Sequence, residues 1–422
     1  LWKSDGTTSG TMMVKDIHSG ASGSSPNHFA VMGSTLYFQA NDGINGHELW
    51  KSDGTTSGTI MVKDINNGSV DSSPTELTVV GSTLFFSAKD SVGRELWKSD
   101  GTASGTVMVK NIWTGSAGPG DGDPKEMTSI GNTLYFQAAS WDIDGDGYFD
   151  GVELWKSDGT TSGTVRVKDI NNNTNGSSTP SDLVVIDYGA LEILFFRASD
   201  GTNGGELWKS DGTTAGTVMV KDIYSGSSSG SADHLTAVGN TLYFKASDGT
   251  NGAELWKSDG TTAGTVMVKD INSGGASIPQ HLTAVGNTLF FQAIDGTNGN
   301  ELWKSDGTTA GTVMVKDINS GGASYPNQLT AVGNTLFFQA TEGTNGNELW
   351  KTFEAPEDAA TATAEAGIHH SGSQVAVITN LTGVTPGWDY TVDWSLYYSS
   401  NGTEIFSFNQ PYSYFINSTT FD

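Results

Sequence analysis

The sequence predicts an all-β protein built from repeated four-stranded sheets, and three observations support this. Each full unit holds four short segments rich in Val, Leu, Phe, Trp and Thr, separated by Gly, Asn and Asp turns, which is typical of consecutive β-hairpins. No stretch of helix length shows an apolar period of 3.6 residues. A Leu-Trp pair recurs, mostly at steps of 47 or 48 residues, and a period of this length indicates a solenoid, a propeller or an array. The tryptophans are Trp2, Trp50, Trp97, Trp155, Trp208, Trp256, Trp303 and Trp350.

The four segments of a unit appear in a constant order. In the most regular unit they read "LTAVG" (segment A), "TLFFQA" (B), "ELWKSD" (C) and "TVMVKDI" (D). Segments B and D are apolar on both faces, whereas a sheet with one wet face would alternate. Four-stranded sheets covered on both faces and repeated radially describe a β-propeller. A stacked β-solenoid is the rival architecture, but its coils are usually shorter.

The number of segments predicts the number of blades. Seven A–B pairs and seven D segments are present, but the D segment at 12–17 has no A–B pair before it. The last A–B–C run, 329–351, has no D segment after it. We therefore expect a seven-bladed β-propeller over residues 1–351 whose last blade is closed by both chain ends. Segment C occurs eight times, which leaves eight blades as the alternative. Because the chain begins inside a motif, we expect the natural protein to be longer.

The repeat carries a resemblance to a known family. "ELWKSDGTTAGT" resembles the ELWxxDGT repeat family of secreted or surface-attached microbial proteins, over residues 1–351. The resemblance implies an extracellular propeller-like module and supplies no agreed activity. The first unit departs from the family pattern because it lacks the Glu, and residues 352–422 lie outside it.

The polar residues that recur in the units are predicted to be structural, because a catalytic group is needed only once. The Asp of "KSDGT" should accept backbone N–H bonds across the C–D turn, which resembles the Asp-box turn of other propellers. The Trp should pack between blades. For the seven Glu before Leu-Trp, the alternative is a ring of carboxylates lining a channel.

The D–A and B–C loops vary between units and should open on the same face, where binding usually resides. Aromatic residues on these loops could stack on sugar rings or cover the loop bases: Trp113, Trp141, Tyr148, Tyr224 and Tyr325. Five histidines fall on variable loops or near segment A and are predicted to be surface residues, with a zinc cluster as the weaker alternative. These are His18, His28, His47, His234 and His281.

One B–C loop is longer and more acidic than the others. From Asp142 it reads D-I-D-G-D-G-Y-F-D-G-V-E, which matches the spacing of a twelve-residue calcium loop. It resembles EF-hand and dockerin-type loops, although no helices flank it. We expect a structural Ca²⁺ ion here, the alternative being a solvated acidic hairpin. The predicted ligands are the side chains of Asp142, Asp144, Asp146, Asp150 and Glu153 and the carbonyl of Tyr148.

The remainder of the chain is predicted to hold a linker and a second domain. Residues 352–372 read as a linker, and 373–422 alternate like the strands of a small β-sandwich-like domain, either complete or cut short at Asp422. Asn-X-Ser/Thr sequences permit glycosylation in an extracellular setting. They occur at Asn67, Asn172, Asn175, Asn380, Asn401 and Asn417.

Composition restricts the partners. With 47 Asp and Glu against 21 Lys and Arg, the net charge of -26 disfavours nucleic acid and anionic membrane surfaces. No apolar run approaches a membrane span, and the absence of Cys excludes disulfides and thiol chemistry. We expect an extracellular or cell-surface protein with a structural, assembly or adhesion role, whose partners are other surface proteins, glycans or copies of itself. A secreted polysaccharide-active enzyme or glycan-binding module is the alternative, although no catalytic set stands out.

Overall fold

The computed structural model describes residues 1–114, 120–141, 143, 145, 147–189 and 191–352, together with the backbone of six strands between 363 and 415. The chain divides into two compact units, Leu1–Lys351 and Thr352–Asp422. The described residues form strands and turns and contain no helix. Accordingly, no helix in this part of the chain has the length and apolarity to cross a membrane.

The described residues of the first unit form 29 strands, which correspond to the four repeated segments. The A strands are β3 (Asn27–Met32), β7 (Thr75–Val80), β11 (Lys125–Ile130), β15 (Ser181–Asp187), β19 (Asp233–Val238), β23 (Gln280–Val285) and β27 (Asn327–Val332). The B strands are β4 (Thr35–Asn41), β8 (Thr83–Lys89), β12 (Thr133–Trp141), β16 (Glu192–Ser199), β20 (Thr241–Ser247), β24 (Thr288–Ile294) and β28 (Thr335–Thr341). The C strands are β1 (Trp2–Lys3), β5 (His47–Ser52), β9 (Arg94–Ser99), β13 (Phe149–Ser157), β17 (Gly205–Ser210), β21 (Ala253–Ser258), β25 (Asn300–Ser305) and β29 (Asn347–Lys351). The D strands are β2 (Met12–Met13), β6 (Ile60–Lys63), β10 (Val107–Lys110), β14 (Val165–Lys168), β18 (Val218–Lys221), β22 (Val266–Lys269) and β26 (Val313–Lys316).

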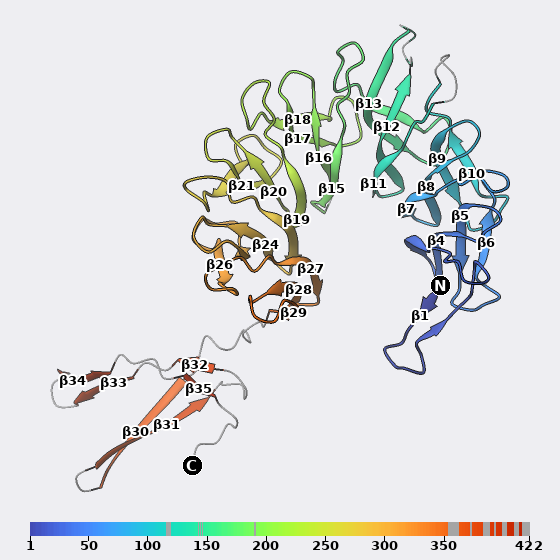
Figure 1. The fold of residues 1–422 in the computed structure, drawn as a ribbon. Coiled ribbons are helices and arrows are strands. Elements are labelled where there is room, and N and C mark those ends of the chain that lie inside the picture. The colour runs from blue at the N-terminus through green and yellow to red at the C-terminus, as the bar shows by residue number, and fades with distance from the viewer. Residues whose placement is uncertain are drawn as a thin grey trace. The chain divides into compact units, whose positions relative to one another are not determined.

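These strands confirm the predicted all-β architecture of repeated four-stranded blades. Six antiparallel sheets have the order A–B–C–D, and we number them blade 1 (β3–β6) to blade 6 (β23–β26). The A strands of neighbouring blades lie side by side along the inner edge, and the D strands lie outside (Figure 1). The blades therefore follow one another radially, as in a β-propeller.

The expected closure of the last blade by both chain ends is not formed in this structure. Strand β29 pairs only with β28, so that sheet has three strands, and β2 pairs only with β1. Each incomplete sheet keeps its own C strand, which accounts for the eighth copy of that segment. Leu349 on β29 is therefore 77% exposed, whereas the equivalent Leu302 in blade 6 is 1% exposed.

The hydrophobic core lies between blades. One cluster joins Leu49, Val62 and Ile65 of blade 1 to Phe86 and Trp97 of blade 2, and the other blade interfaces repeat this arrangement. The Trp therefore packs against the preceding blade, as its recurrence predicts.

In blades 1 to 5, two lysines of each blade donate hydrogen bonds to the next blade. In blade 1, Lys51 donates from Nζ to the carbonyl of Gly101 at 2.8 Å, and Lys63 donates to the carbonyl of Thr106 at 2.8 Å. Lys63 Nζ also lies 5.8 Å from the centre of the Trp97 ring, a distance suited to a cation–π contact. Long apolar stems and cationic ends thus connect neighbouring blades.

The C–D turn has the predicted Asp-box hydrogen bonds. Asp53 Oδ1 accepts from the backbone N–H of Thr55 at 2.9 Å and from its hydroxyl at 2.7 Å. Gly54 has a φ of 85°, a left-handed conformation that a residue without Cβ adopts freely. Ser52 and Thr59 link the two ends of the turn through their hydroxyls at 2.7 Å.

The described residues of the second unit form six strands, which pair as three antiparallel two-stranded sheets. β30 (Thr363–Ser371) pairs with β31 (Gln374–Thr382), and β33 (Trp394–Tyr398) pairs with β34 (Thr403–Phe408). β32 (Asp389–Thr391) pairs with β35 (Ser413–Phe415).

Candidate functional site

In the six complete blades the repeated Glu of segment C is buried and does not line a channel. Glu48 is 0% exposed; its Oε2 accepts from the N–H of Ile65 at 2.9 Å and from the hydroxyl of Ser72 at 2.6 Å. Its Oε1 accepts from the N–H of Ser72 at 3.0 Å. Each such Glu thus holds both ends of the D–A loop that leaves its blade. Glu95, Glu153, Glu206, Glu254 and Glu301 are buried in the same way.

Burial also affects the ionisation of these groups. It raises the pKa of Glu48 from 4.5 to about 7. The three hydrogen bonds to the carboxylate lower this pKa and the charge of Asp64 raises it, but each of these effects is smaller than that of burial. The pKa values of Glu95, Glu153 and Glu206 rise to about 7 for the same first cause. The ring of carboxylates is therefore part of the scaffold.

The acidic insertion of blade 3 is anchored by an arginine that replaces the repeated Met of the D strand. Arg166 Nη1 lies 3.2 Å from Asp150 Oδ1, and the Asp150 side chain is only 4% exposed. The second oxygen, Oδ2, accepts from the N–H of Ile143 at 2.7 Å. Equivalent positions in the other complete blades hold Met61, Met108, Met219, Met267 and Met314. Arg166 and the insertion thus occur together in one blade. Comparison of the repeats shows this joint departure, but the sequence analysis did not use it to predict the contact.

Two of the six predicted calcium ligands do not fit ligation. Asp150 is engaged by Arg166 and Ile143, as described. Glu153 lies within the β12–β13 ladder opposite Ala138 and accepts from Ile170, Asn171 and Ser178, as the repeated Glu of every complete blade binds its own loop. Tyr148, in the loop, is 53% exposed. Asp142, Asp144 and Asp146 lie outside the described residues, so the calcium prediction stays a prediction for the tip of the loop.

Three aromatic rings gather at the base of this insertion. Trp113 follows blade 2, whereas Trp141 and Phe149 face each other across β12 and β13. The Trp113 ring centre lies 5.8 Å from both other centres, and the remaining separation is 6.3 Å. All three rings are partly exposed. The variable D–A and B–C loops therefore meet here, and we call Trp113, Trp141, Phe149 and Arg166 the blade-3 rim.

A cavity of about 450 Å³ opens beside the blade-3 rim. Its walls combine apolar and cationic side chains, and the Lys110 ammonium group lies 5.6 Å from the centre of the Trp155 ring. Such a mixture of aromatic surface and a few polar groups is typical of ligand sites. The lining residues are Lys110, Ile112, Thr114, Ile143, Trp155, Val165 and Arg166.

A second feature lies on the innermost strands and was not predicted. The second residue of every A strand has a positive φ of 52° to 59°, although none is Gly. Left-handed backbone is uncommon for residues with a Cβ and often marks a functional position. Here it accompanies the register shift at the start of each A strand. We call these residues the inner row: His28, Glu76, Glu126, Asp182, His234, His281 and Gln328.

Side chains in the middle of the inner row bind the next member of the row. Glu76 Oε2 accepts from the N–H of Glu126 at 3.1 Å, and Glu126 Oε2 accepts from the N–H of Asp182 at 2.9 Å. Asp182 Oδ2 accepts from the N–H of His234 at 3.1 Å. Burial, and then the charges of Asp182 and Glu76, raise the pKa of Glu126.

The inner row changes the interpretation of one histidine. His28, which was expected on a variable loop, lies on the inner strand β3, whereas His234 and His281 lie at the start of A strands, as expected. His47, on β5, lies with Nδ1 3.1 Å from Oδ1 of Asp71. Within the described residues, no group of three or more His, Cys, Asp or Glu side chains is arranged to hold a metal ion.

Three of the predicted glycosylation sites lie in the described part of the first unit. Asn67, Asn172 and Asn175 are exposed, and Asn175 Oδ1 accepts from the N–H of Phe149 at 3.2 Å. Asn380 lies on β31, whereas Asn401 and Asn417 lie outside the described residues. Attachment of glycans at these sites stays a prediction.

Comparisons with known proteins give neither a family nor an activity. No protein-family model matches the chain, and no curated protein matches its sequence. Solved structures similar to it include a puromycin hydrolase at 12% identity and a TM-score of 0.44, with 86% of this chain and 59% of that chain covered. A puromycin-hydrolyzing peptidase of Mycobacterium tuberculosis shows 13% identity and a TM-score of 0.44, with 82% and 56% covered. Oligopeptidase B of Leishmania major shows 12% and 0.44, with 84% and 52% covered. The chain thus spans less than two thirds of those proteins, and similarity this low transfers no function.

Proposed function

We propose that this chain is an extracellular binding and surface-assembly module without catalytic activity, and that it recognises glycans at the blade-3 rim. The observation that supports this most is the meeting of the two loops that depart furthest from the repeat. Their three aromatic rings are partly exposed and lie beside a cavity of about 450 Å³. Aromatic faces combined with a few fixed polar groups suit a sugar ring, which has an apolar face and a polar edge. Other surface proteins and further copies of the chain remain proposed partners.

The rim is also held in place, which favours binding over a merely flexible loop. Arg166 and Asp150 connect the insertion to the outer strand, and Thr114 Oγ1 donates to the carbonyl of Trp141 at 3.2 Å. Preorganised side chains bind more tightly because less conformational entropy is lost on association.

Glycan binding at the rim is tested by titrating the intact protein with a panel of microbial and host glycans. Trp113→Ala and Trp141→Ala should each abolish measurable binding of the best ligand, whereas the matched variant Tyr325→Ala should bind normally. Tyr325 is 56% exposed on a D–A loop elsewhere and controls for the loss of a surface aromatic residue. Equal binding by all three variants would remove the rim as the site.

Calcium remains part of the proposal, restricted to the tip of the insertion. We assign Asp142, Asp144, Asp146 and the carbonyl of Tyr148 as its ligands, because acids at this spacing suit a hard cation and repel one another without one. Calorimetry on chelator-treated protein should show calcium-dependent heat that Asp144→Ala removes. A silent titration of the parent protein would favour the solvated acidic hairpin.

A secreted polysaccharide-active enzyme is the second candidate, supported by one observation. Glu126 has a raised pKa and lies between two further carboxylates of the inner row, Glu76 and Asp182. Carboxylates whose environments separate their pKa values are the groups that glycoside hydrolysis uses. A reducing-sugar assay decides the matter: turnover that is lost in Glu126→Gln would replace the binding proposal.

A further inference from the structure

Two neighbouring members of the inner row are histidines held in the same conformation. His234 on β19 has a φ of 59° and His281 on β23 has a φ of 56°. Their strands are the innermost strands of blades 5 and 6 and lie side by side. Because equivalent residues of adjacent blades occupy equivalent places, the two imidazoles project from the same edge of their strands.

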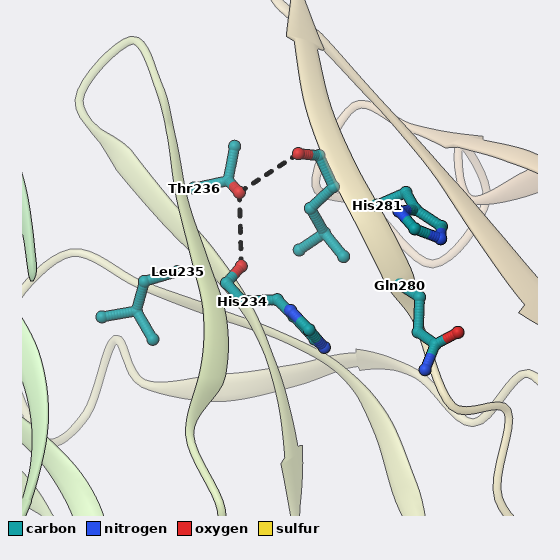
Figure 2. A pocket seen from close by; sticks show the side chains of 6 residues that line it. His234, Leu235, Thr236, Gln280 and His281 are labelled. Atoms are coloured by element: carbon teal, nitrogen blue, oxygen red, sulfur yellow. Dashed lines mark hydrogen bonds between the residues drawn. The ribbon is translucent and has the colours of Figure 1, made fainter. Parts of the chain in front are cut away.

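The two imidazoles face a common cavity. Figure 2 shows His234, His281 and Gln280 directed to the same side, around a space of about 290 Å³. Thr236 Oγ1 donates to the carbonyl of His234 at 3.2 Å and to the carbonyl of Leu282 at 3.4 Å, which connects the two strands beside the cavity. The Thr236 hydroxyl therefore joins the two strands next to the histidines, and no loop takes part in this contact.

The ring nitrogens of both histidines are available to a ligand. Neither imidazole makes a side-chain hydrogen bond to another described residue, and the same is true of the Gln280 amide. The acids nearby are engaged, since Asp182 accepts from His234 N–H and Asp233 pairs with Arg197 and Lys245.

We propose that His234 and His281 form a two-imidazole site for one borderline divalent transition-metal ion such as Zn²⁺, Ni²⁺ or Cu²⁺. Neutral imidazole is a preferred ligand for these ions, whereas Ca²⁺ prefers oxygen ligands. Water completes the coordination, because the described residues contain no set of three metal-binding side chains at one place. The site is therefore open, unlike a closed structural zinc site. It lies in blades 5 and 6 and is separate from the calcium loop of blade 3.

The test uses Cu²⁺ as the probe, added to chelator-treated intact protein in excess Ca²⁺. Electron paramagnetic resonance should show one equivalent of Cu²⁺ coupled to two nitrogens. His234→Gln and His281→Gln should each leave one coupled nitrogen and weaken binding by about tenfold or more, the size of loss that altered metal environments cause.

The matched control is His28→Gln, which changes the same row position in blade 1, where the next row member is Glu76. It should leave Cu²⁺ binding unchanged. Because His28, His234 and His281 are exposed, all three variants should melt at the temperature of the parent protein without metal. Copper bound only through oxygen, no saturable binding, or an equal loss in His28→Gln would each overturn the proposal.

Discussion

Replacing Glu254 by Ala should destabilise one blade strongly, and the structure gives the size of the effect. The carboxylate is 0% exposed and accepts from Ile271 N–H at 3.0 Å, from Ser277 N–H at 2.7 Å and from the Ser277 hydroxyl at 2.6 Å. Removing it leaves the N–H groups of Ile271 and Ser277 buried without partners, at about 1–3 kcal/mol each, and leaves the Ser277 hydroxyl only the carbonyl of Ala253 at 3.4 Å. Part of this loss is offset because burial disfavours the ionised carboxylate. We expect a net loss of about 3–5 kcal/mol in the stability of blade 5.

Glu348→Ala is the matched control. Glu348 occupies the same place in the motif, but its side chain is exposed because β29 has no D strand beside it. Its substitution should change stability by less than about 0.5 kcal/mol. Because a chain of repeats need not unfold in two states, urea titration should be combined with amide hydrogen exchange over residues 271–277. Exchange there should accelerate in Glu254→Ala alone; equal behaviour of the two variants would refute this account of the buried Glu.

Three other predictions follow from the same contacts. The folded state favours the protonated forms of four buried glutamates, because their pKa values rise from 4.5 to about 7: Glu48, Glu95, Glu153 and Glu206. Their contribution to the free energy of unfolding is complete below pH 4.5 and is lost as the pH rises through about 7. The urea midpoint should therefore fall across that range. Arg166→Met restores the residue of the other blades but leaves Asp150 buried without its cation. We expect a loss of about 3–5 kcal/mol in stability and faster amide hydrogen exchange in the insertion. Unchanged exchange would contradict the anchoring role. Thr161→Ala removes a 2.8 Å hydrogen bond to the carbonyl of Val109 in the preceding blade and should cost about 1 kcal/mol in urea unfolding, a small loss because Ala103 stands naturally at this position in blade 2.

The strand order could be predicted because each blade repeats the same local signals. Short apolar segments, turn residues and the Asp of the C–D turn all act over fewer than ten residues, and they predict the same local structure in every unit. The Asp53 hydrogen bonds are an example, since the acceptor and its donors lie two residues apart.

The partners of the buried Glu could not be predicted in the same way. Glu48 binds residues 17 and 24 positions further along the chain, and no local pattern encodes that contact. Spacing along the chain also matched Glu153 to a calcium loop, whereas strand pairing places it in a ladder opposite Ala138. The spacing of residues along the chain does not determine which of them belong to the loop and which to the strand.

The inner row and the chain ends depend on geometry beyond a single unit. The left-handed residues accompany a register shift at the start of each A strand, and a side chain such as that of Glu126 has no preference for that conformation. Closure of the ring depends on the angle of rotation from one blade to the next, which the repeated motif does not determine. The complementary end segments therefore suggested a shared blade that the structure does not form.

The lysine contacts between blades all run in the same direction along the chain, which has a mechanical consequence. Blades 1 to 5 each donate their lysines to the blade that follows, as Lys51 and Lys63 do, and each blade touches only its neighbours. A pulling force on the two ends of the unit would therefore load interfaces of nearly equal strength in series. Each interface that gave way would release one repeat of about 47 residues, or roughly 160 Å of extended chain, while the remaining blades stayed folded. Under flow, such a protein would lengthen in steps and dissipate work at each one.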